Sequence, residues 1–465
     1  MHTKNILITV IIVLLFVSLT VVLAQKPFFD GAPDPESQAV MRQAAIDIEK
    51  YRKGNFILHI VDIDGNPIKD AVVEAELSSH IFDFGTNLFG ISALNDDNPL
   101  KEVAKQTIID IFNTVAVVNY WHHPQNEQHV EKIQTDIAWA QANNLRTRFH
   151  AVFFNDPRHI FFGNDFSEEQ CWEKIEERIK YVADATSGEL PEYDVINEMV
   201  SKIEWDRDRP NAFMKNVPNF PDFTDPQVVK RVFDMTRKYL PNTKLVGLEA
   251  QVPSINNPVY MEIIEYWKRC LAIGADIDLI GTQAHFYTGG MEYQEGHWRF
   301  GPETFHMKKV NLALEALRSI ERPIVITEFN GPSRNSTDNP VNREKFWTMS
   351  DYENSAWQIN FYRLAFSKPY IEGLTRWFHI DNLGGRGMDA GILYESGEKH
   401  QIYYDLRKLI KEEWHTNVVL TTTQDGKANF RGFLGYYTIS TDGYKPETLR
   451  LDNDSMEIVI KLIKI

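Results

Sequence analysis

EYDVINE, residues 192–198, is a short, β-branched run that ends in the acid Glu198. Further along, PIVITEFN at residues 323–330 carries Glu328 in the same kind of position. Runs of this type are typical of buried parallel strands. In an eight-stranded α/β barrel, the carboxyl ends of the strands form the face on which active sites lie. We therefore expect the two glutamates to share that face, and two carboxylates are the minimum equipment for cleaving a glycosidic bond.

Short apolar runs alternate with helical segments from about residue 80 to residue 410, which indicates an α/β fold of repeated βα units around a parallel sheet. Eight runs are strand candidates, and eight strands close a (β/α)8 TIM barrel. The candidates are Ile81–Gly85, Thr114–Tyr120, Arg146–Phe153, Tyr193–Asn197, Lys244–Leu248, Leu279–His285, Pro323–Glu328 and Leu374–His379. A doubly wound open sheet is the alternative, but it normally shows a Gly-rich phosphate turn that this sequence lacks.

The segments on either side of the barrel have the pattern of short strands joined by turns. Residues 55–79 predict two strands around a turn at residues 64–67, and residues 416–465 predict several strands with Asp-Gly turns. A two-stranded hairpin alone is marginally stable in water. We therefore expect both segments to form one discontinuous, all-β, sandwich-like domain, with the catalytic barrel, residues 80–415, inserted into it. Residues 25–54 are expected to be a leader and a helix.

The N-terminus carries an apolar run from Ile6 to Leu23, followed by Ala24. This pattern predicts a signal peptide, residues 1–24, cut before Gln25, and hence a secreted or extracytoplasmic protein with no membrane attachment after cleavage. The run is longer than an ordinary signal core. A retained N-terminal membrane anchor is therefore the alternative.

Composition narrows the classes of partner and cofactor. The 465 residues include 49 Lys and Arg against 65 Asp and Glu, a net charge of −16, and the chain has no basic cluster, so we expect no nucleic-acid partner. Cys171 and Cys270 form neither a disulfide framework nor a zinc pattern, and we expect two free buried thiols, with a single bridge as the alternative. The sequence predicts no metal, no cofactor and a monomer.

The order and spacing of the active-face segments resemble glycoside hydrolase family 10, a family of (β/α)8 barrels acting as retaining endo-β-1,4-xylanases. The resemblance covers roughly residues 80–410. It is carried by Phe112-Asn113, DVINE at 194–198, GTQAHF at 281–286, Ile326-Thr327-Glu328, and Trp377 with Asp381. It implies double-displacement cleavage of β-1,4-linked xylan or a related plant-type β-glycan, so the expected partner is a polysaccharide or oligosaccharide.

The resemblance also implies roles for individual residues. Glu198 is the expected general acid/base and Glu328 the expected nucleophile, because the leaving oxygen needs a proton and the anomeric carbon needs an anion. Asn197 resembles the family's ligand for the sugar 2-hydroxyl. Gln283 and His285 resemble the residues that orient the acid/base and hydrogen-bond the nucleophile, and their alternate positions on one strand point them the same way.

Four further residues match sugar-binding positions of the family. Trp377 resembles the aromatic floor beneath the reacting sugar, since sugar rings pack their C–H faces on indole; the alternative is that it belongs to the barrel core. His150 and Asn119 resemble hydrogen-bonding ligands of the sugars. His122 stands where the family usually has Lys, and we expect it on the glycone side of the site.

The chain departs from the family pattern at several sugar-binding positions, while the catalytic pair and its supports match. The departures are Val118 for Glu, His122 for Lys, Phe154 and Asn155 for Trp and His, Tyr193 for Trp, Gly385 for an aromatic residue, and Leu248-Glu249-Ala250-Gln251 for Asn-Asp-Tyr-Asn. The resemblance therefore supports bond cleavage more strongly than it supports xylan as the polymer.

Two other functions fit the same scaffold. A metal-dependent hydrolase is suggested by histidines near strand ends, but the His-x-His pair expected on its first strand is replaced by Phe82-Asp83-Phe84. A non-catalytic glycan-binding protein is allowed by the altered walls. The presence of both Glu198 and Glu328 argues against it, because binding alone needs no protonated acid opposite an anion.

Overall fold

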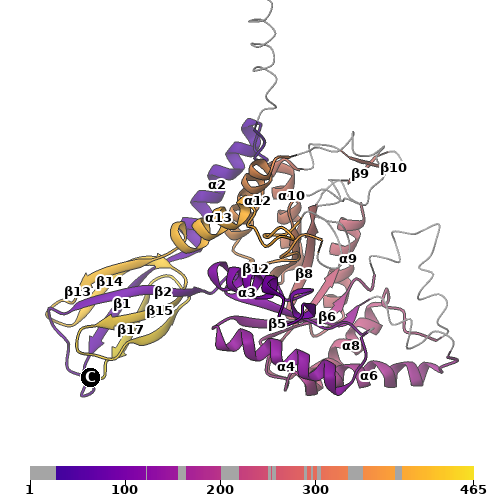
Figure 1. Cartoon of the computed structure of the whole chain (residues 1–465), viewed down its shortest axis with the longest axis horizontal. Helices are drawn as coiled ribbons and strands as arrows, with labels where there is room; N and C mark the ends of the chain where they lie inside the picture. The colour runs from indigo at the N-terminus through magenta and orange to yellow at the C-terminus, as the bar shows by residue number, and fades with distance from the viewer. Residues whose placement is uncertain are drawn as a thin grey trace, which may run out of the picture.

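The computed structural model describes residues 28–121, 123–154, 164–200, 219–249, 253, 258–286, 291–294, 297–300, 305–332, 349–382 and 390–465. Figure 1 shows a barrel of strands surrounded by helices, and a smaller pair of sheets that extends to one side of it. Helix α2 (Pro35–Tyr51) lies against the barrel and leads into the sheets.

Eight parallel strands close the barrel in the order β11-β12-β3-β4-β5-β6-β7-β8. They are β3 (Asp83–Asn87), β4 (Thr114–Val118), β5 (Arg146–Phe154), β6 (Glu192–Asn197), β7 (Lys244–Glu249), β8 (Leu279–His285), β11 (Ile324–Asn330) and β12 (Ile371–Arg376). The predicted eight-stranded barrel is confirmed, and the open-sheet alternative is wrong. The last strand ends at Arg376 rather than His379, because Trp377 and Phe378 belong to an aromatic cluster beyond the strand.

Helices follow the strands and cover the outside of the barrel. They are α3 (Pro99–Ile111), α4 (Glu127–Ala142), α6 (Glu168–Ala185), α8 (Pro226–Tyr239), α9 (Pro258–Ala272), α10 (Met307–Leu317), α12 (Asp351–Ser367) and α13 (Gln401–Lys408). Three short helical elements and one hairpin complete this region. They are the 3₁₀ helices η1 (Ile91–Ala93) and η4 (Arg318–Ile320), the π-helix η5 (Leu409–Glu413), and the hairpin of β9 (Met291–Gln294) and β10 (His297–Phe300). Ser167 and Ser350 each form a capping box that satisfies first-turn N–H groups, which explains why α6 and α12 begin there.

A small apolar cluster fills the inside of the barrel. Val246 and Leu248 of β7 meet Leu279 of β8 and Val325 of β11, and all four are buried. Because side chains alternate across a strand, Gln283 and His285, which share the parity of Leu279, point to the inside at the carboxyl end of β8. In β11 the register shifts after Ile326, and this irregularity brings Glu328 to the same side although Val325 has the opposite parity. The catalytic face is therefore built directly on this packed interior.

The flanking segments form two stacked sheets, ordered β14-β1-β17 and β13-β2-β15-β16. Their strands are β1 (Lys53–Val61), β2 (Val72–His80), β13 (Asn417–Thr421), β14 (Lys427–Phe433), β15 (Gly435–Thr441), β16 (Glu447–Leu451) and β17 (Met456–Lys461). Figure 1 shows the indigo N-terminal strands lying beside the yellow C-terminal ones. The all-β part made from both ends of the chain is thus confirmed, with β16 as an additional strand, while the boundaries predicted for this domain stay a prediction.

The sheets meet the barrel at the amino ends of its strands. β2 ends at His80, three residues before β3 begins, and Phe84 of β3 stacks on Trp414 with ring centroids 5.5 Å apart. Arg52, buried at the end of α2, donates hydrogen bonds to the carbonyl oxygens of Phe366, Lys368 and Ile371 at 2.5 to 2.7 Å. The carboxyl ends of the barrel strands, where Glu198 and Glu328 lie, face away from this junction.

Candidate active site

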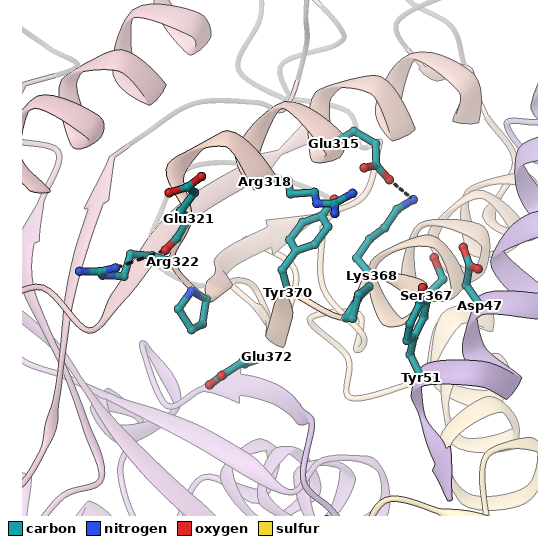
Figure 2. A pocket seen from close by; sticks show the side chains of 12 residues that line it. Asp47, Tyr51, Glu315, Arg318, Glu321, Arg322, Ser367, Lys368, Tyr370 and Glu372 are labelled. Carbon is teal, nitrogen blue, oxygen red and sulfur yellow. Dashed lines mark hydrogen bonds and ion pairs between the residues drawn. The ribbon is translucent and has the colours of Figure 1, made fainter. Parts of the chain in front are cut away.

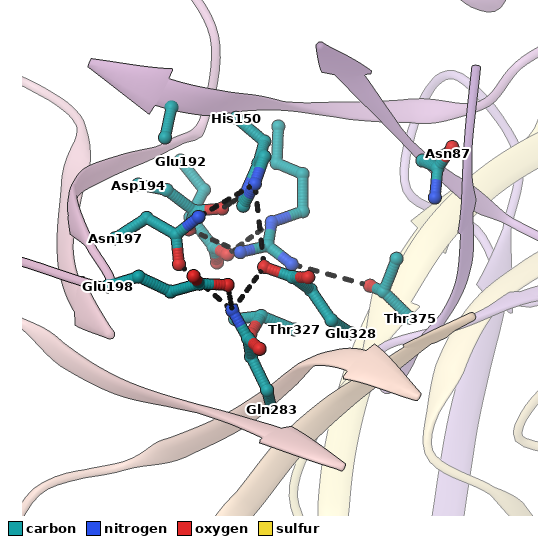
Figure 3. Close-up of polar contacts among 12 residues, drawn as sticks. Asn87, His150, Glu192, Asp194, Asn197, Glu198, Gln283, Thr327, Glu328 and Thr375 are labelled. Carbon is teal, nitrogen blue, oxygen red and sulfur yellow. Dashed lines mark hydrogen bonds and ion pairs between the residues drawn. The ribbon is translucent and has the colours of Figure 1, made fainter. Parts of the chain in front are cut away.

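Glu198 and Glu328 share a single hydrogen-bond donor at the carboxyl end of the barrel (Figure 3). Glu198 follows β6, and Glu328 lies near the end of β11. The amide nitrogen Nε2 of Gln283 donates to Oε1 of each glutamate at 2.8 Å. The two acceptor oxygens therefore lie no further apart than the sum of the two bonds, 5.6 Å.

Gln283 also reaches the residue before the acid/base candidate. Its Nε2 lies 3.1 Å from Oδ1 of Asn197, so three oxygens surround an amide group that has two hydrogens. The predicted placement of Gln283 and Asn197 beside the two glutamates agrees with this geometry. Their roles toward a substrate stay a prediction.

His285 is held in one tautomer by a chain of hydrogen bonds. The backbone N–H of Phe378 donates to Oδ1 of Asn330 at 3.1 Å, which leaves the Nδ2 of Asn330 to donate to Nδ1 of His285 at 2.7 Å. With Nδ1 accepting, the ring proton lies on Nε2, which is 3.0 Å from Oε2 of Glu328. His285 therefore donates to the nucleophile candidate, a contact that favours its anionic form.

Glu328 is only 3% exposed, and this burial is the largest cause of the rise in its pKa. Burial raises the pKa of Glu328 to about 8, against the lowering effect of His150, and the negative charges of Glu198 and Asp194 add to the rise. The negative charge of Glu198 is thus one of the causes that disfavour ionisation of Glu328. Near neutral pH the carboxyl group of Glu328 therefore holds a proton in the free protein.

A buried charge network supports the floor of this site. Nδ1 of His150 lies 2.6 Å from Oδ2 of Asp194, and the other carboxylate oxygen of Asp194 pairs with Arg148. Although burial raises the pKa of Asp194, Arg148 and His150 lower it below its usual value overall. Asp194 thus remains a carboxylate and accepts a hydrogen bond from Nδ1–H of His150. The Nε2 of His150 is 3.3 Å from Nδ2 of Asn197 and 3.5 Å from Oε1 of Glu328.

Trp377 lies just beyond β12 and faces the histidines of the site. Its ring is 4.9 Å from that of His150 and 6.5 Å from that of His285, measured between centroids. Phe89 stacks on it at 5.9 Å with the planes 19° apart, and Tyr120 joins the same aromatic cluster. The cluster is separate from the main core and places Trp377 beside the two histidines, while its role as a floor for a sugar stays a prediction.

The remaining predicted sugar ligands differ in what the structure shows of them. Asn119 is buried, and its Oδ1 accepts a hydrogen bond of 3.0 Å from Arg178 of α6. Arg178 also donates to the backbone oxygens of Asn119, Ala151 and Val152, so it clamps the ends of β4 and β5 together. His122 lies outside the described residues.

Among the described residues, no three His, Cys, Asp or Glu side chains form a group that could hold a metal ion. Figure 2 shows a pocket of about 650 Å³ at the amino ends of β11 and β12, lined by residues such as Arg318, Tyr370 and Glu372. It contains none of the candidate active-site residues and lies at the opposite end of the barrel.

Comparison with known proteins gives a consistent family match. Residues 83–401 match the model of glycosyl hydrolase family 10. The anti-sigma-I factor RsgI6 of Acetivibrio thermocellus is 24% identical over 407 residues, which are 86% of this chain and 46% of that protein. Endo-1,4-beta-xylanase B of Thermotoga neapolitana is 25% identical over 233 residues, 48% of this chain and 62% of the enzyme. The chain thus spans about half the length of these relatives.

Solved structures show the same barrel. Xylanase 10B from Thermotoga petrophila RKU-1, in complex with xylobiose, superposes with a TM-score of 0.54 at 16% identity, covering 71% of this chain and 94% of that one. Native xylanase 10B from Thermotoga maritima gives a TM-score of 0.53, also at 16% identity, covering 71% of this chain and 95% of that one. At this level of identity, the likeness concerns the fold.

Proposed function

Because this chain belongs to glycosyl hydrolase family 10, we propose that it is a glycosidase that cleaves β-1,4-linked xylan or a related β-glycan by a retaining double displacement. In the first step, Glu328 attacks the anomeric carbon while Glu198 donates a proton to the leaving oxygen. In the second, Glu198 removes a proton from water, and this water releases the sugar from Glu328.

One observation carries this proposal: Gln283 bonds the two glutamates through the same nitrogen. The resulting limit of 5.6 Å between their oxygens lies near the separation of roughly 5–5.5 Å typical of retaining enzymes. It is shorter than the separation of roughly 6.5–9.5 Å that leaves room for water in inverting enzymes. The hydrogen bond from His285 to Glu328 suits a nucleophile, because it favours the anionic form of that carboxyl group.

The direct test is to incubate the purified chain with xylan and other β-1,4-glycans and to follow the anomeric configuration of the new reducing ends by NMR. Retention of the β configuration is expected first, before mutarotation. Glu328→Ala should abolish turnover, whereas Glu198→Ala should keep activity on aryl glycosides with good leaving groups, which need less protonation. Initial products of inverted configuration would contradict the assignment of Glu328 as nucleophile.

Binding of a glycan without cleavage is the second candidate. The relative named an anti-sigma-I factor aligns with 86% of this chain, so a related sequence occurs in a protein whose name indicates regulation rather than degradation. The altered sugar-binding positions are compatible with such a role. Turnover of an activated aryl β-xyloside or β-cellobioside decides between the two, because a pure binding protein would release no aryl alcohol.

We propose further that the chain acts outside the cytoplasm, as its N-terminal apolar run suggests. Among the described helices, none is long and apolar enough to cross a membrane, and residues 1–27 lie outside the described part. N-terminal sequencing of the mature protein would distinguish cleavage before Gln25 from a retained membrane anchor.

A further inference from the structure

A third buried carboxylate lies beside the catalytic pair. Glu249 is the last residue of β7 and is only 1% exposed. In the barrel register, its neighbour Leu248 pairs with Asn197 of β6, and Glu249 itself pairs with Thr282 of β8. Glu249 therefore lies between the strand that leads to Glu198 and the strand that carries Gln283.

Strand alternation places this carboxylate outside the sugar-binding site. Leu248 packs in the interior of the barrel, so the next residue projects toward the layer of helices. The electrostatics agree: burial raises the pKa of Tyr266 on α9 well above its usual value, and the charges of Cys270 and then Glu249 add to this rise. Glu249 is thus placed to act on the site through the protein rather than on a substrate.

The contact that it makes is with the turn that presents Glu198. Oε1 of Glu249 accepts a hydrogen bond of 2.9 Å from the backbone N–H of Val200. Met199 and Val200 are both buried, and Glu198 itself has a φ of +54°, in the left-handed region that side chains other than glycine disfavour. A strained turn persists only where its surroundings hold it, and a hydrogen bond from a buried N–H is a restraint that is costly to lose.

We propose that Glu249 is a positioning residue that fixes the acid/base Glu198 for proton transfer. Glu198 is then held at two points, with its carboxyl group bonded to Gln283 and its backbone turn bonded to Glu249. Loss of the second restraint lets the turn relax and moves the carboxyl group away from the leaving oxygen. The nucleophile Glu328, on β11, keeps its own contacts with Gln283 and His285. This inference rests on the proposed glycosidase activity.

The test compares kcat/KM for two aryl β-xylobiosides that differ in their leaving group. 2,4-Dinitrophenolate leaves without protonation, whereas phenolate needs the acid, and kcat/KM reports only the steps up to cleavage of the aryl bond. General acid catalysis contributes roughly 10²–10⁴-fold to the rate. Glu249→Ala should therefore lower kcat/KM for the phenyl substrate about 10-fold or more. For the dinitrophenyl substrate, it should lower kcat/KM less than about 3-fold. Glu249→Gln, which keeps an oxygen acceptor, should restore most of the loss.

Two further variants separate positioning from folding. Glu249→Asp keeps a carboxyl group but is one methylene shorter, and it should show the same dependence on the leaving group if Glu249→Ala does not fold. Asn113→Ala removes a buried side chain with several backbone hydrogen bonds at the opposite end of the barrel and should affect both substrates equally. Equal losses on both substrates in the Glu249 variants, or no loss, would overturn the inference. Absence of turnover of these substrates and of the corresponding aryl β-cellobiosides by the unmodified chain would overturn the proposed function, and this inference with it.

Discussion

Replacement of Glu328 by glutamine should make the fold less sensitive to alkaline pH. The pKa of Glu328 is raised by burial from the ordinary value of 4.5 to about 8. Between these two values the folded chain binds a proton that the unfolded chain has released, so the free energy of unfolding falls as the pH rises through this window. Glutamine cannot ionise, and the variant therefore lacks this contribution.

The size of the effect follows from the two pKa values. Each unit of pKa difference corresponds to about 1.4 kcal/mol. Integrating the difference in bound protons from about pH 5 to about pH 9 shows that the free energy of unfolding of the unmodified chain falls by roughly 4 kcal/mol. The Glu328→Gln variant should not lose this amount.

Urea unfolding of both proteins at about pH 5 and about pH 9 measures this difference directly. Glu131→Gln, on the exposed face of α4, is the matched control and should follow the unmodified chain at both pH values. If Glu328→Gln loses as much stability toward pH 9 as the unmodified chain, then Glu328 does not bind a proton more tightly in the folded state. Burial would then not raise the pKa of Glu328 as described above.

The other predictions concern the junction between the sheets and the barrel, and one buried histidine. Arg52→Met should lower the free energy of unfolding by about 3 kcal/mol in urea titrations, because the buried carbonyls of Phe366, Lys368 and Ile371 lose this donor. An unchanged midpoint would show that water replaces the guanidinium group. Deletion of Thr416–Ile465 removes every strand that pairs with β1 and β2 and should lower the melting temperature in calorimetry; an unaltered transition would mean that the barrel is independent of the sheets. His400 bonds Asp381 at 2.8 Å and Asp351 at 3.0 Å, and although burial lowers its pKa, these partners raise it overall. The stability that protonated His400 contributes is complete below about pH 6.5 and is lost as the pH rises through its pKa in the folded chain. His400→Gln should therefore destabilise the chain more at about pH 5 than at about pH 9. Equal destabilisation at both pH values would show that His400 stays neutral.

The barrel could be predicted because its strands are buried on both sides and read as continuous apolar runs. The same rule misplaced the end of the last strand, since Trp377 and Phe378 are hydrophobic for a different reason: they pack in the aromatic cluster of the active face. β16 (Glu447–Leu451) was missed because it is a short, half-exposed edge strand of mixed polar and apolar residues. Its sequence alone hardly indicates a strand, and its pairing with β15 is visible only in the fold.

The two glutamates could be anticipated because each ends an apolar run, and the alternate positions of Gln283 and His285 indicated a common direction. Their bonds to the glutamates were implied by the resemblance to glycoside hydrolase family 10. Residues that act from other elements carry no such local signal. Arg178 looks like an ordinary charged position on an amphipathic helix, and only the fold shows that it is fully buried against the backbone of β5. Asn330 likewise gains its role from the distant residues His285 and Phe378, which the linear order does not bring together.

The pairing of β1 with β14 also governs the order in which the molecule can be assembled. Lys53 of β1 lies opposite Phe433 of β14, although all eight barrel strands come between these two residues in the sequence. A chain that emerges from its N-terminus exposes the edges of β1 and β2 until the last strands are made, and unpaired edges of this kind invite association with other chains. The barrel, whose strands pair in chain order except where the ring closes, can form meanwhile. Pairing of the last strands then completes the molecule, so yield should depend on how quickly the final fifty residues follow the rest.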